Sequence, residues 1–399
     1  MGKITVINGA RIVTPDGVVE NGTMVVKENV IAEIGATRRM GDTTIEAEGR
    51  WVLPGIVDSH SDAIEHEMFP RPTSYFPLET SFYELERKLV GQGITTIYHS
   101  LSMWGDERRS GSQRNEARRN EAVFEYIKRI CRLREERRMI RHNVHLRYEM
   151  TNIDGLPYVR NILEQGCIDQ LSFMDHTPGQ GQYRDSAIQL NFIMEKQNKN
   201  RDEAMAMLEM RKSFPKTDEA SLLELAALAR AKGIPLASHD DDSIEKLDRV
   251  TEWQAVISEF PVDLEVAVEA KRRGLYTVMG APNVLLGRSH SNNLSALEAI
   301  GEGVVDILCS DYYPPAMLQA VFALHRLGYE LPYAVNMVSL NPARALGIDS
   351  RTGSLEVGKE ADLLLVNEHS GKPFIEKVWA GGELVCQMSC QLGTALAAR

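Results

Sequence analysis

The sequence predicts an α/β fold in which a (β/α)₈, TIM-like barrel is joined to a small β-sandwich built from both chain ends. Three observations predict this fold. Short β-branched apolar runs alternate with longer amphipathic stretches through the middle of the chain, a pattern typical of parallel strands with helical crossovers. Both chain ends consist instead of short alternating runs. The length of 399 residues suits one barrel of roughly 250–300 residues and a smaller unit.

The two chain ends carry strand patterns without helices between them. Residues 3–50 contain ITVING, GTMVVKENVIAEIG and TTIEAEG, which are separated by Gly, Asn and Asp turns. Residues 353–386 contain GSLEVGKEADLLLVN and FIEKVWAGGELVC. We therefore expect residues 1–52 and 353–399 to form one composite β-sandwich, and residues 53–352 to form the barrel.

The middle of the chain contains seven short apolar runs that are typical of buried strands. An eighth strand cannot be placed, but this number fits a closed barrel better than an open sheet. Neither a GxGxxG nor a P-loop spacing, which would indicate nucleotide binding, is present. The seven runs are GIVDSH, GITTIYHSL, NVHLRYEM, QLSFMDH, IPLASHD, YTVMGAP and VDILCSD.

Two connections are longer than a barrel requires. Residues 104–142 are rich in Arg and Glu and predict a helix whose amphipathic part is EAVFEYIKRICRL. The Arg-rich run at 108–119 suggests a phosphate clamp, but the acidic residues beside it favour a solvated helix face. Residues 177–219 form a polar helical insert after a predicted strand, which is interpreted either as a lid or interface or as a solvated excursion.

Composition and charge exclude several classes of function. The net charge of −11 argues against nucleic-acid and membrane-surface binding, although it permits an anionic small-molecule substrate. The five cysteines are scattered and predict no disulfide framework. No apolar run approaches the ~20 residues of a membrane span, and the N-terminus lacks the pattern of a signal peptide. We expect a cytoplasmic protein and leave a homo-oligomer open.

The informative feature of the chain is that its predicted strands end in side chains that can bind a metal. His60 and Asp62 are two residues apart, so on an extended chain both point the same way. Because the carboxyl ends of barrel strands meet on one face, the other strand-end residues should join them there. One such histidine would more often belong to the core, but the joint pattern predicts a hydrolytic Zn, Mn or Fe site. The other residues are Glu149, His176, His239 and Asp311.

These residues lie in motifs that resemble the amidohydrolase superfamily over nearly the whole chain. The resemblance rests on VLPGIVDSHSD and on NPARALG followed by GSLEVGKEADLLLV. The usual HxH motif of the first strand is replaced by His60-Ser61-Asp62. With this replacement, the sequence is similar to one subfamily, the diphosphatases of the carbon–phosphorus lyase pathway. The motifs shared with it are MFPRP at 68–72, MDHTPGQ at 174–180, ASHDD at 237–241, MGAPNVLLGRSHS at 279–291 and SDYYP at 310–314.

The resemblance implies an activity and a metal site. Members of this subfamily hydrolyse α-D-ribose 1-methylphosphonate 5-triphosphate to the 5-phosphate and pyrophosphate. The implied cofactor is a divalent metal, Zn or Mn, as one or two ions, because three carboxylates among the ligands favour harder cations. Asp311 is implied as the catalytic general base, and Glu149 as the bridge if two ions bind. The implied ligand set is His60, Asp62, Glu149, His176, His239 and Asp311.

Several polar residues near these motifs are candidates for binding substrate phosphates, because a guanidinium matches phosphate oxygens. A structural ion pair is the alternative for Arg71 and Arg147. Asp240 and Asp241 either hold His239 in one tautomer or cap a helix. The substrate-binding candidates are Arg71, Arg147, Arg288, Ser289 and His290.

Two other classes of function are compatible with this fold. The first is an amidohydrolase acting on a non-peptide C–N bond, such as a deacylase or cyclic amidase. Asp62 and the MGAPNVLLGRSHS motif argue against it. The second is a noncatalytic barrel used for assembly, which is disfavoured because five strand ends keep metal-capable residues.

Overall fold

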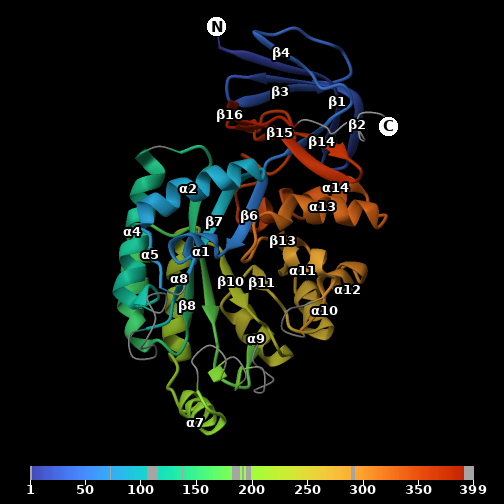
Figure 1. Ribbon diagram of the computed structural model, residues 1–399. Helices are drawn as coiled ribbons and strands as arrows, with labels where there is room; N and C mark the ends of the chain where they lie inside the picture. Colours follow the sequence, from blue (N-terminus) through green and yellow to red (C-terminus); the bar gives the residue numbers. More distant parts are fainter. Residues whose placement is uncertain are drawn as a thin grey trace.

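The computed structural model describes residues 2–71, 73–105, 116–136, 138–181, 189–190, 193–194, 199–288 and 293–390. Figure 1 shows a small sheet at the top of the molecule, which contains strands from both ends of the chain, above a barrel surrounded by helices. Helix α7, Arg201–Lys212, lies at the opposite end, toward which the arrow of strand β8, Arg141–Glu149, points. The small sheet and α7 therefore lie at opposite ends of the barrel.

The two chain ends meet in one mixed sheet, as the sequence predicts. Strand β5 pairs with β1 in parallel and with β14 in the antiparallel direction, so it joins the N-terminal strands to the C-terminal ones. The sheet has its own apolar core, which includes Ile7, Ile12 and Trp379. The exact domain boundaries near residues 52 and 353 stay a prediction. The strands are β1 Ile4–Thr14, β2 Gly17–Lys27, β3 Val30–Gly35, β4 Thr43–Glu46, β5 Trp51–Pro54, β14 Leu363–His369, β15 Lys372–Ala380 and β16 Glu383–Gln387.

The second sheet confirms the predicted barrel. Its eight described strands run in chain order from β6 to β13, and every neighbouring pair is parallel. The strand that the sequence patterns did not place is β11, which is only three residues long. The strands are β6 Ile56–Ser61, β7 Ile94–Met103, β8, β9 Gln170–Met174, β10 Leu236–His239, β11 Ile257–Glu259, β12 Tyr276–Gly280 and β13 Ile307–Cys309.

The barrel closes at its carboxyl end, between β6 and β13. A parallel bridge pairs Ser61 with Asp311. The backbone N–H of Asp311 donates to the carbonyl of His60 over 3.0 Å, and the N–H of Asp62 donates to the carbonyl of Asp311 over 2.7 Å. Closure of the barrel thus places three predicted site residues side by side.

Helices connect successive barrel strands, as a parallel sheet requires. Polar side chains begin several of them: Asp218, Ser243 and Asp263 accept from backbone N–H groups at the starts of α8, α9 and α10. The helices are α1 Ala63–Met68, α2 Leu78–Gly91, α4 Asn120–Glu136, α5 Leu156–Gln165 with the 3₁₀ turn Ile153–Gly155 before it, α7, α8 Glu219–Ala231, α9 Ile244–Glu252, α10 Leu264–Arg272, α11 Ala281–Leu286, α12 Ala296–Gly301, α13 Ala316–Arg326, α14 Leu331–Asn336 and α15 Leu340–Ala345.

The two long connections are described in part. Helix α4 matches the predicted amphipathic helix. The prediction of a solvated helix face at 108–119 is wrong for Arg118, because this side chain lies before α4 and is largely buried against Glu65. Residues 106–115 lie outside the described residues. The insert at 177–219 contains α7, and its role as a lid stays a prediction.

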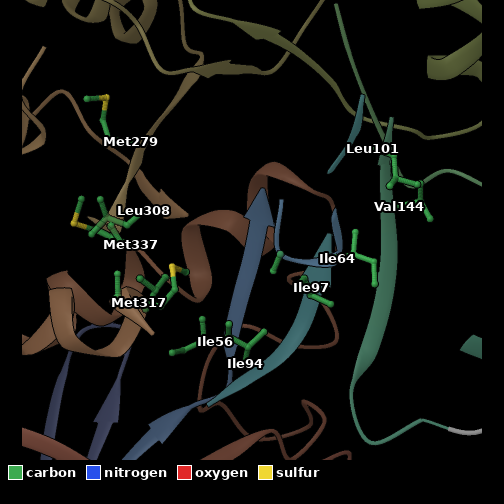
Figure 2. Packing of buried hydrophobic residues seen from close by; sticks show 14 of the residues in the cluster. Ile56, Ile64, Ile94, Ile97, Leu101, Val144, Met279, Leu308, Met317 and Met337 are labelled. Carbon is green, nitrogen blue, oxygen red and sulfur yellow. The ribbon is translucent and has the colours of Figure 1, made fainter. Parts of the chain in front are cut away.

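The main apolar core lies between the outer faces of the barrel strands and the helices. Figure 2 shows Ile56 and Ile94 next to each other on neighbouring strands, where they are register partners. Ile97 lies three residues further along β7. These residues are at most 1% exposed. Packing of this kind tolerates little loss of volume.

We expect Ile97→Ala to lower the free energy of unfolding by about 2–5 kcal/mol, because it leaves a cavity in this core. Denaturant unfolding followed by circular dichroism measures the change. The matched control is Ile153→Ala, at a position that is 40% exposed, where the loss should stay within about 0.5 kcal/mol. Equal losses in both variants would contradict the importance of this packing.

Candidate metal centre

The predicted ligands lie at the carboxyl ends of five barrel strands. His60 is in β6, Glu149 is the last residue of β8 and His239 is the last residue of β10. Asp62, His176 and Asp311 follow the ends of β6, β9 and β13 by one or two residues. None of the six is exposed, so each lies inside this end of the barrel and not on its outer surface.

Three histidines run across the site. The ring centroids of His60 and His239 are 5.5 Å apart, and those of His239 and His176 are 6.2 Å apart. Nδ1 of His176 lies 2.7 Å from Oε2 of Glu149, and the indole of Trp104 stacks on the His176 ring with centroids 4.7 Å apart. The structure therefore brings together residues that are up to 179 positions apart, from 60 to 239.

Arg147 connects two of the predicted ligands. Its Nη1 donates to Oδ1 of Asp62 over 3.2 Å, and its Nη2 lies 2.8 Å from Nε2 of His239. Because a guanidinium only donates, Nε2 of His239 must be the acceptor. Burial lowers the pKa of His239, and the charge of Arg147 opposes its protonation further. Burial alone would raise the pKa of Asp62, but Arg147 and His60 hold it below its ordinary value.

Asp240 lies between two histidines of the site. Its Oδ2 is 2.8 Å from Nδ1 of His239 and 3.8 Å from Nε2 of His176. The interpretation of Asp240 as a helix cap is wrong, because Ser243 caps α9. Asp241 is also not the cap, and accepts from the hydroxyls of Ser238 and Ser258 over 2.5 Å.

Three non-glycine residues just after barrel strands adopt left-handed backbone conformations. Asp240 has φ of 53°, Phe260 has φ of 56° and Asp311 has φ of 54°. Such conformations are unfavourable for residues with a Cβ and persist where the surroundings enforce them, often at functional sites. All three occur where the chain turns out of a barrel strand: Asp311 is itself a predicted ligand, Asp240 follows His239, and Phe260 follows Glu259.

Glu259 and His145 are site residues that the sequence patterns did not reveal. Oε1 of Glu259 lies 3.1 Å from Nδ1 of His60, and Oε2 lies 3.8 Å from Nε2 of His145. Among the described residues, this trio brings three ligand-type atoms within 4.8 Å of one another. A signal was present, because Glu259 also ends a barrel strand, but that strand is too short to be recognised. Burial alone would raise the pKa of Glu259, but His145 and His60 lower it to about 2.

Apart from Arg147, the structure gives little detail on how the predicted substrate-binding residues are held. Arg71 is exposed in the segment after α1, and Arg288 is exposed just after α11. Both segments follow the carboxyl ends of barrel strands, β6 and β12, on the side where barrel active sites lie. Ser289 and His290 lie outside the described residues. The roles of all four stay predictions.

The end of the 177–219 insert packs against this end of the barrel. The N–H of Thr217 donates to the carbonyl of Met150 over 2.7 Å. Nζ of Lys216 lies 2.6 Å from Oδ2 of Asp175, one residue before His176. These contacts hold the end of the insert beside the strand ends that carry Glu149 and His176.

The residues of the site fit a divalent cation. Nε2 of His60 is buried and has no hydrogen-bond partner among the described residues. A buried imidazole nitrogen in this state is unfavourable unless something binds its lone pair. Carboxylates and imidazoles are the donors that Zn²⁺ and Mn²⁺ prefer, and the three carboxylates would balance the charge of a cation.

The fold and the ligand-type residues at its strand ends define a barrel hydrolase, and the sequence comparison agrees. The model of the amidohydrolase family matches residues 182–385. The chain belongs to this family, whose members generally use divalent metals. No helix in the described parts of the chain combines the length and apolar character that crossing a membrane would require.

Among known proteins, the chain is similar to the α-D-ribose 1-methylphosphonate 5-triphosphate diphosphatase of Escherichia coli K12. The two are 32% identical over 390 residues, which cover 95% of this chain and 100% of the relative. Solved structures show the same fold at lower identity. Ochratoxinase of A. niger is 15% identical with a TM-score of 0.65, over 96% of this chain and 95% of the other. Dihydropyrimidinase of Brevibacillus agri is 13% identical with a TM-score of 0.60, over the same shares.

Proposed function

We propose that this hydrolase is a metal-dependent diphosphatase of phosphonate catabolism, which cleaves α-D-ribose 1-methylphosphonate 5-triphosphate into the 5-phosphate and pyrophosphate. The observation that carries the proposal is the similarity to the E. coli diphosphatase along its entire length. The HxD arrangement of His60 and Asp62 and the nearby arginines support it, because a phosphoanhydride substrate brings several negative charges.

The proposed metal site uses the strand-end residues described above. When bound, one or two Zn or Mn ions would supply Lewis-acid polarisation of a phosphate oxygen and a water of lowered pKa. Oδ1 of Asp62 and Nε2 of His239 both contact Arg147. Arg147 would therefore have to move away from whichever of these two atoms binds the cation. The residues proposed to hold the metal are His60, Asp62, Glu149, His176, His239 and Asp311.

The remaining chemistry falls to side chains of the chain itself. Asp311 orients the attacking water and accepts its proton as general base. The water oxygen forms a bond to the α-phosphorus while the bond from this phosphorus to the α,β-bridging oxygen breaks, and pyrophosphate leaves. Arginines bind the phosphate oxygens, because phosphoryl transfer depends mainly on positioning and charge neutralisation. The proposed binding residues are Arg71, Arg147, Arg288, Ser289 and His290.

The test is a pyrophosphate-release assay on the purified protein supplied with Zn²⁺ or Mn²⁺. We expect pyrophosphate and the ribose 5-phosphate product in equal amounts from the triphosphate substrate. A panel of N-acyl amino acids and cyclic amides, assayed in parallel, serves as the comparison. Turnover of an amide without any release of pyrophosphate would replace the proposal by C–N bond hydrolysis.

A further inference from the structure

A layer of buried polar side chains lies inside the barrel beneath the candidate metal centre. On β8, His145 lies two residues before Arg147 and therefore on the same inward face, one layer deeper. On β11, Glu259 lies two residues after Ile257, which shares an apolar cluster with Val57 and Val278 from other barrel strands. Barrel interiors are usually filled with branched apolar residues, so this layer is unusual. Its fully buried members are Ser100, His145, Gln170, Ser172 and Glu259.

Glu259 is held from two other strands through one of its carboxylate oxygens. Its Oε1 accepts from Nε2 of Gln170 on β9 over 3.3 Å and lies 3.1 Å from Nδ1 of His60 on β6. Its Oε2 lies 3.8 Å from Nε2 of His145 on β8 and has no hydrogen-bond partner among the described residues. Removing a carboxylate from water costs several kcal/mol unless charged or hydrogen-bonding groups compensate. A group that is this costly to bury suggests a role beyond filling space.

The contact between Glu259 and His60 determines which nitrogen of the His60 ring is available to bind a metal ion. A carboxylate only accepts, so Nδ1 of His60 carries the proton that faces Oε1 of Glu259. In the neutral ring Nε2 then bears the lone pair, and it is the buried nitrogen without a partner among the described residues. Outer carboxylates that hold the distal N–H of a ligating histidine fix its tautomer and ring orientation in this way.

The same trio of residues could itself be a cage for a metal ion, but its hydrogen bonds argue against this. Nε2 of His145 is 2.9 Å from Oγ of Ser172, and Nδ1 is 3.3 Å from Oγ of Ser100. As a ligand, His145 would therefore have to give up one of these hydrogen bonds. The geometry matches a supporting network in which Nε2 of His60 is the histidine nitrogen of the trio that has no hydrogen-bond partner among the described residues.

We propose that Glu259 is a positioning residue, which holds Nδ1–H of His60 and so presents Nε2 of His60 to the cation. This inference rests on the proposed metal site and adds to it a residue outside the predicted ligand set. Gln170 helps to keep the Glu259 carboxylate in place through its hydrogen bond to Oε1.

The chain offers a matched control in a second buried glutamate–histidine pair. Glu86 on α2 is fully buried, its Oε1 lies 3.2 Å from Nε2 of His142, and it also accepts from the backbone N–H of Met139. His142 is on the outward face of β8, since its position alternates with that of His145. Glu86→Gln therefore removes the same charge from the same kind of pair, outside the barrel interior.

The experiment measures the affinity of the purified, metal-stripped protein for Zn²⁺ and Mn²⁺ by competition with a chromophoric chelator. We expect Glu259→Gln to weaken binding by about 10–100-fold and Glu86→Gln to leave the affinity unchanged while lowering the melting temperature. Unchanged affinity in Glu259→Gln, when the wild type binds metal, would overturn this inference alone. A wild type that binds neither metal would overturn the proposed metal site as well.

A second set of measurements does not need the Glu259→Gln variant. Histidine-ring ¹⁵N spectra of the metal-free wild type, assigned with a His60→Gln sample, report which nitrogen of His60 is protonated. The inference requires a proton on Nδ1, so a ring that is protonated at Nε2 but not at Nδ1 would refute it. Loss of metal in His145→Gln as complete as in His60→Gln would also refute it, in favour of a cage.

Discussion

We expect Asp311→Asn to lower kcat by about 10²–10⁴-fold, because general-base catalysis typically contributes this much. Asparagine keeps an oxygen at the same position but cannot accept the proton of the attacking water at neutral pH. The backbone of Asp311 also closes the barrel through its bonds to His60 and Asp62, and the substitution leaves these bonds intact. The measurement combines pyrophosphate release with metal content by inductively coupled plasma mass spectrometry, which should stay near that of the wild type.

The control for this variant lies at the other end of the same strand. Asp306 precedes β13 and pairs with Lys271, so Asp306→Asn removes a carboxylate far from the carboxyl-end site. Turnover should be unchanged in this control. Full activity in Asp311→Asn would refute the general-base role, whereas loss of metal from that variant would reassign Asp311 as chiefly a ligand.

His239→Ala is expected to lose the metal itself. Losing an outer partner of a ligand weakens metal binding by about 10–100-fold, so losing a ligand should weaken it by more than about 100-fold. The substitution also leaves Nη2 of Arg147 without the acceptor that it has at 2.8 Å. Metal content after dialysis against trace Zn²⁺ or Mn²⁺ measures the effect, and activity should fall in proportion to it.

The matched histidine is His325 on α13, whose Nδ1 lies 3.0 Å from the carbonyl oxygen of Tyr329. His325→Ala should retain the metal and the activity of the wild type. Unchanged metal stoichiometry in His239→Ala would contradict the ligand assignment. The Arg147 contact would then be the main role of His239.

The barrel was predictable because seven of its eight strands carry their own local pattern. Runs such as GITTIYHSL are long enough to be recognised, and β7 spans ten residues. Strand β11 spans three, which is too short for any periodicity to appear. It exists because β10 and β12 flank it and supply its backbone partners. Glu259 was missed together with the strand that carries it.

The candidate site was also predictable in part: its location was, but the contacts within it were not. The rule that parallel strands end on one face places His60, Glu149 and His239 at one end of the barrel from the direction of the chain alone. It does not say which side chains touch. Arg147 was predicted as a substrate-binding residue with an ion pair as the alternative, and in the structure it contacts Asp62 and His239.

The sequence by itself determined the order of elements, the barrel with its added sheet, and the residue types at the strand ends, because these depend on local periodicity and on chain direction. Only the tertiary structure decided that Asp311 closes the barrel against His60, that Arg147 joins Asp62 to His239, and that Glu259 lies beside His60. These contacts join residues as much as 251 positions apart, from 60 to 311. They depend on how eight strands close into a barrel and on which inward side chains share a layer, which no local pattern encodes.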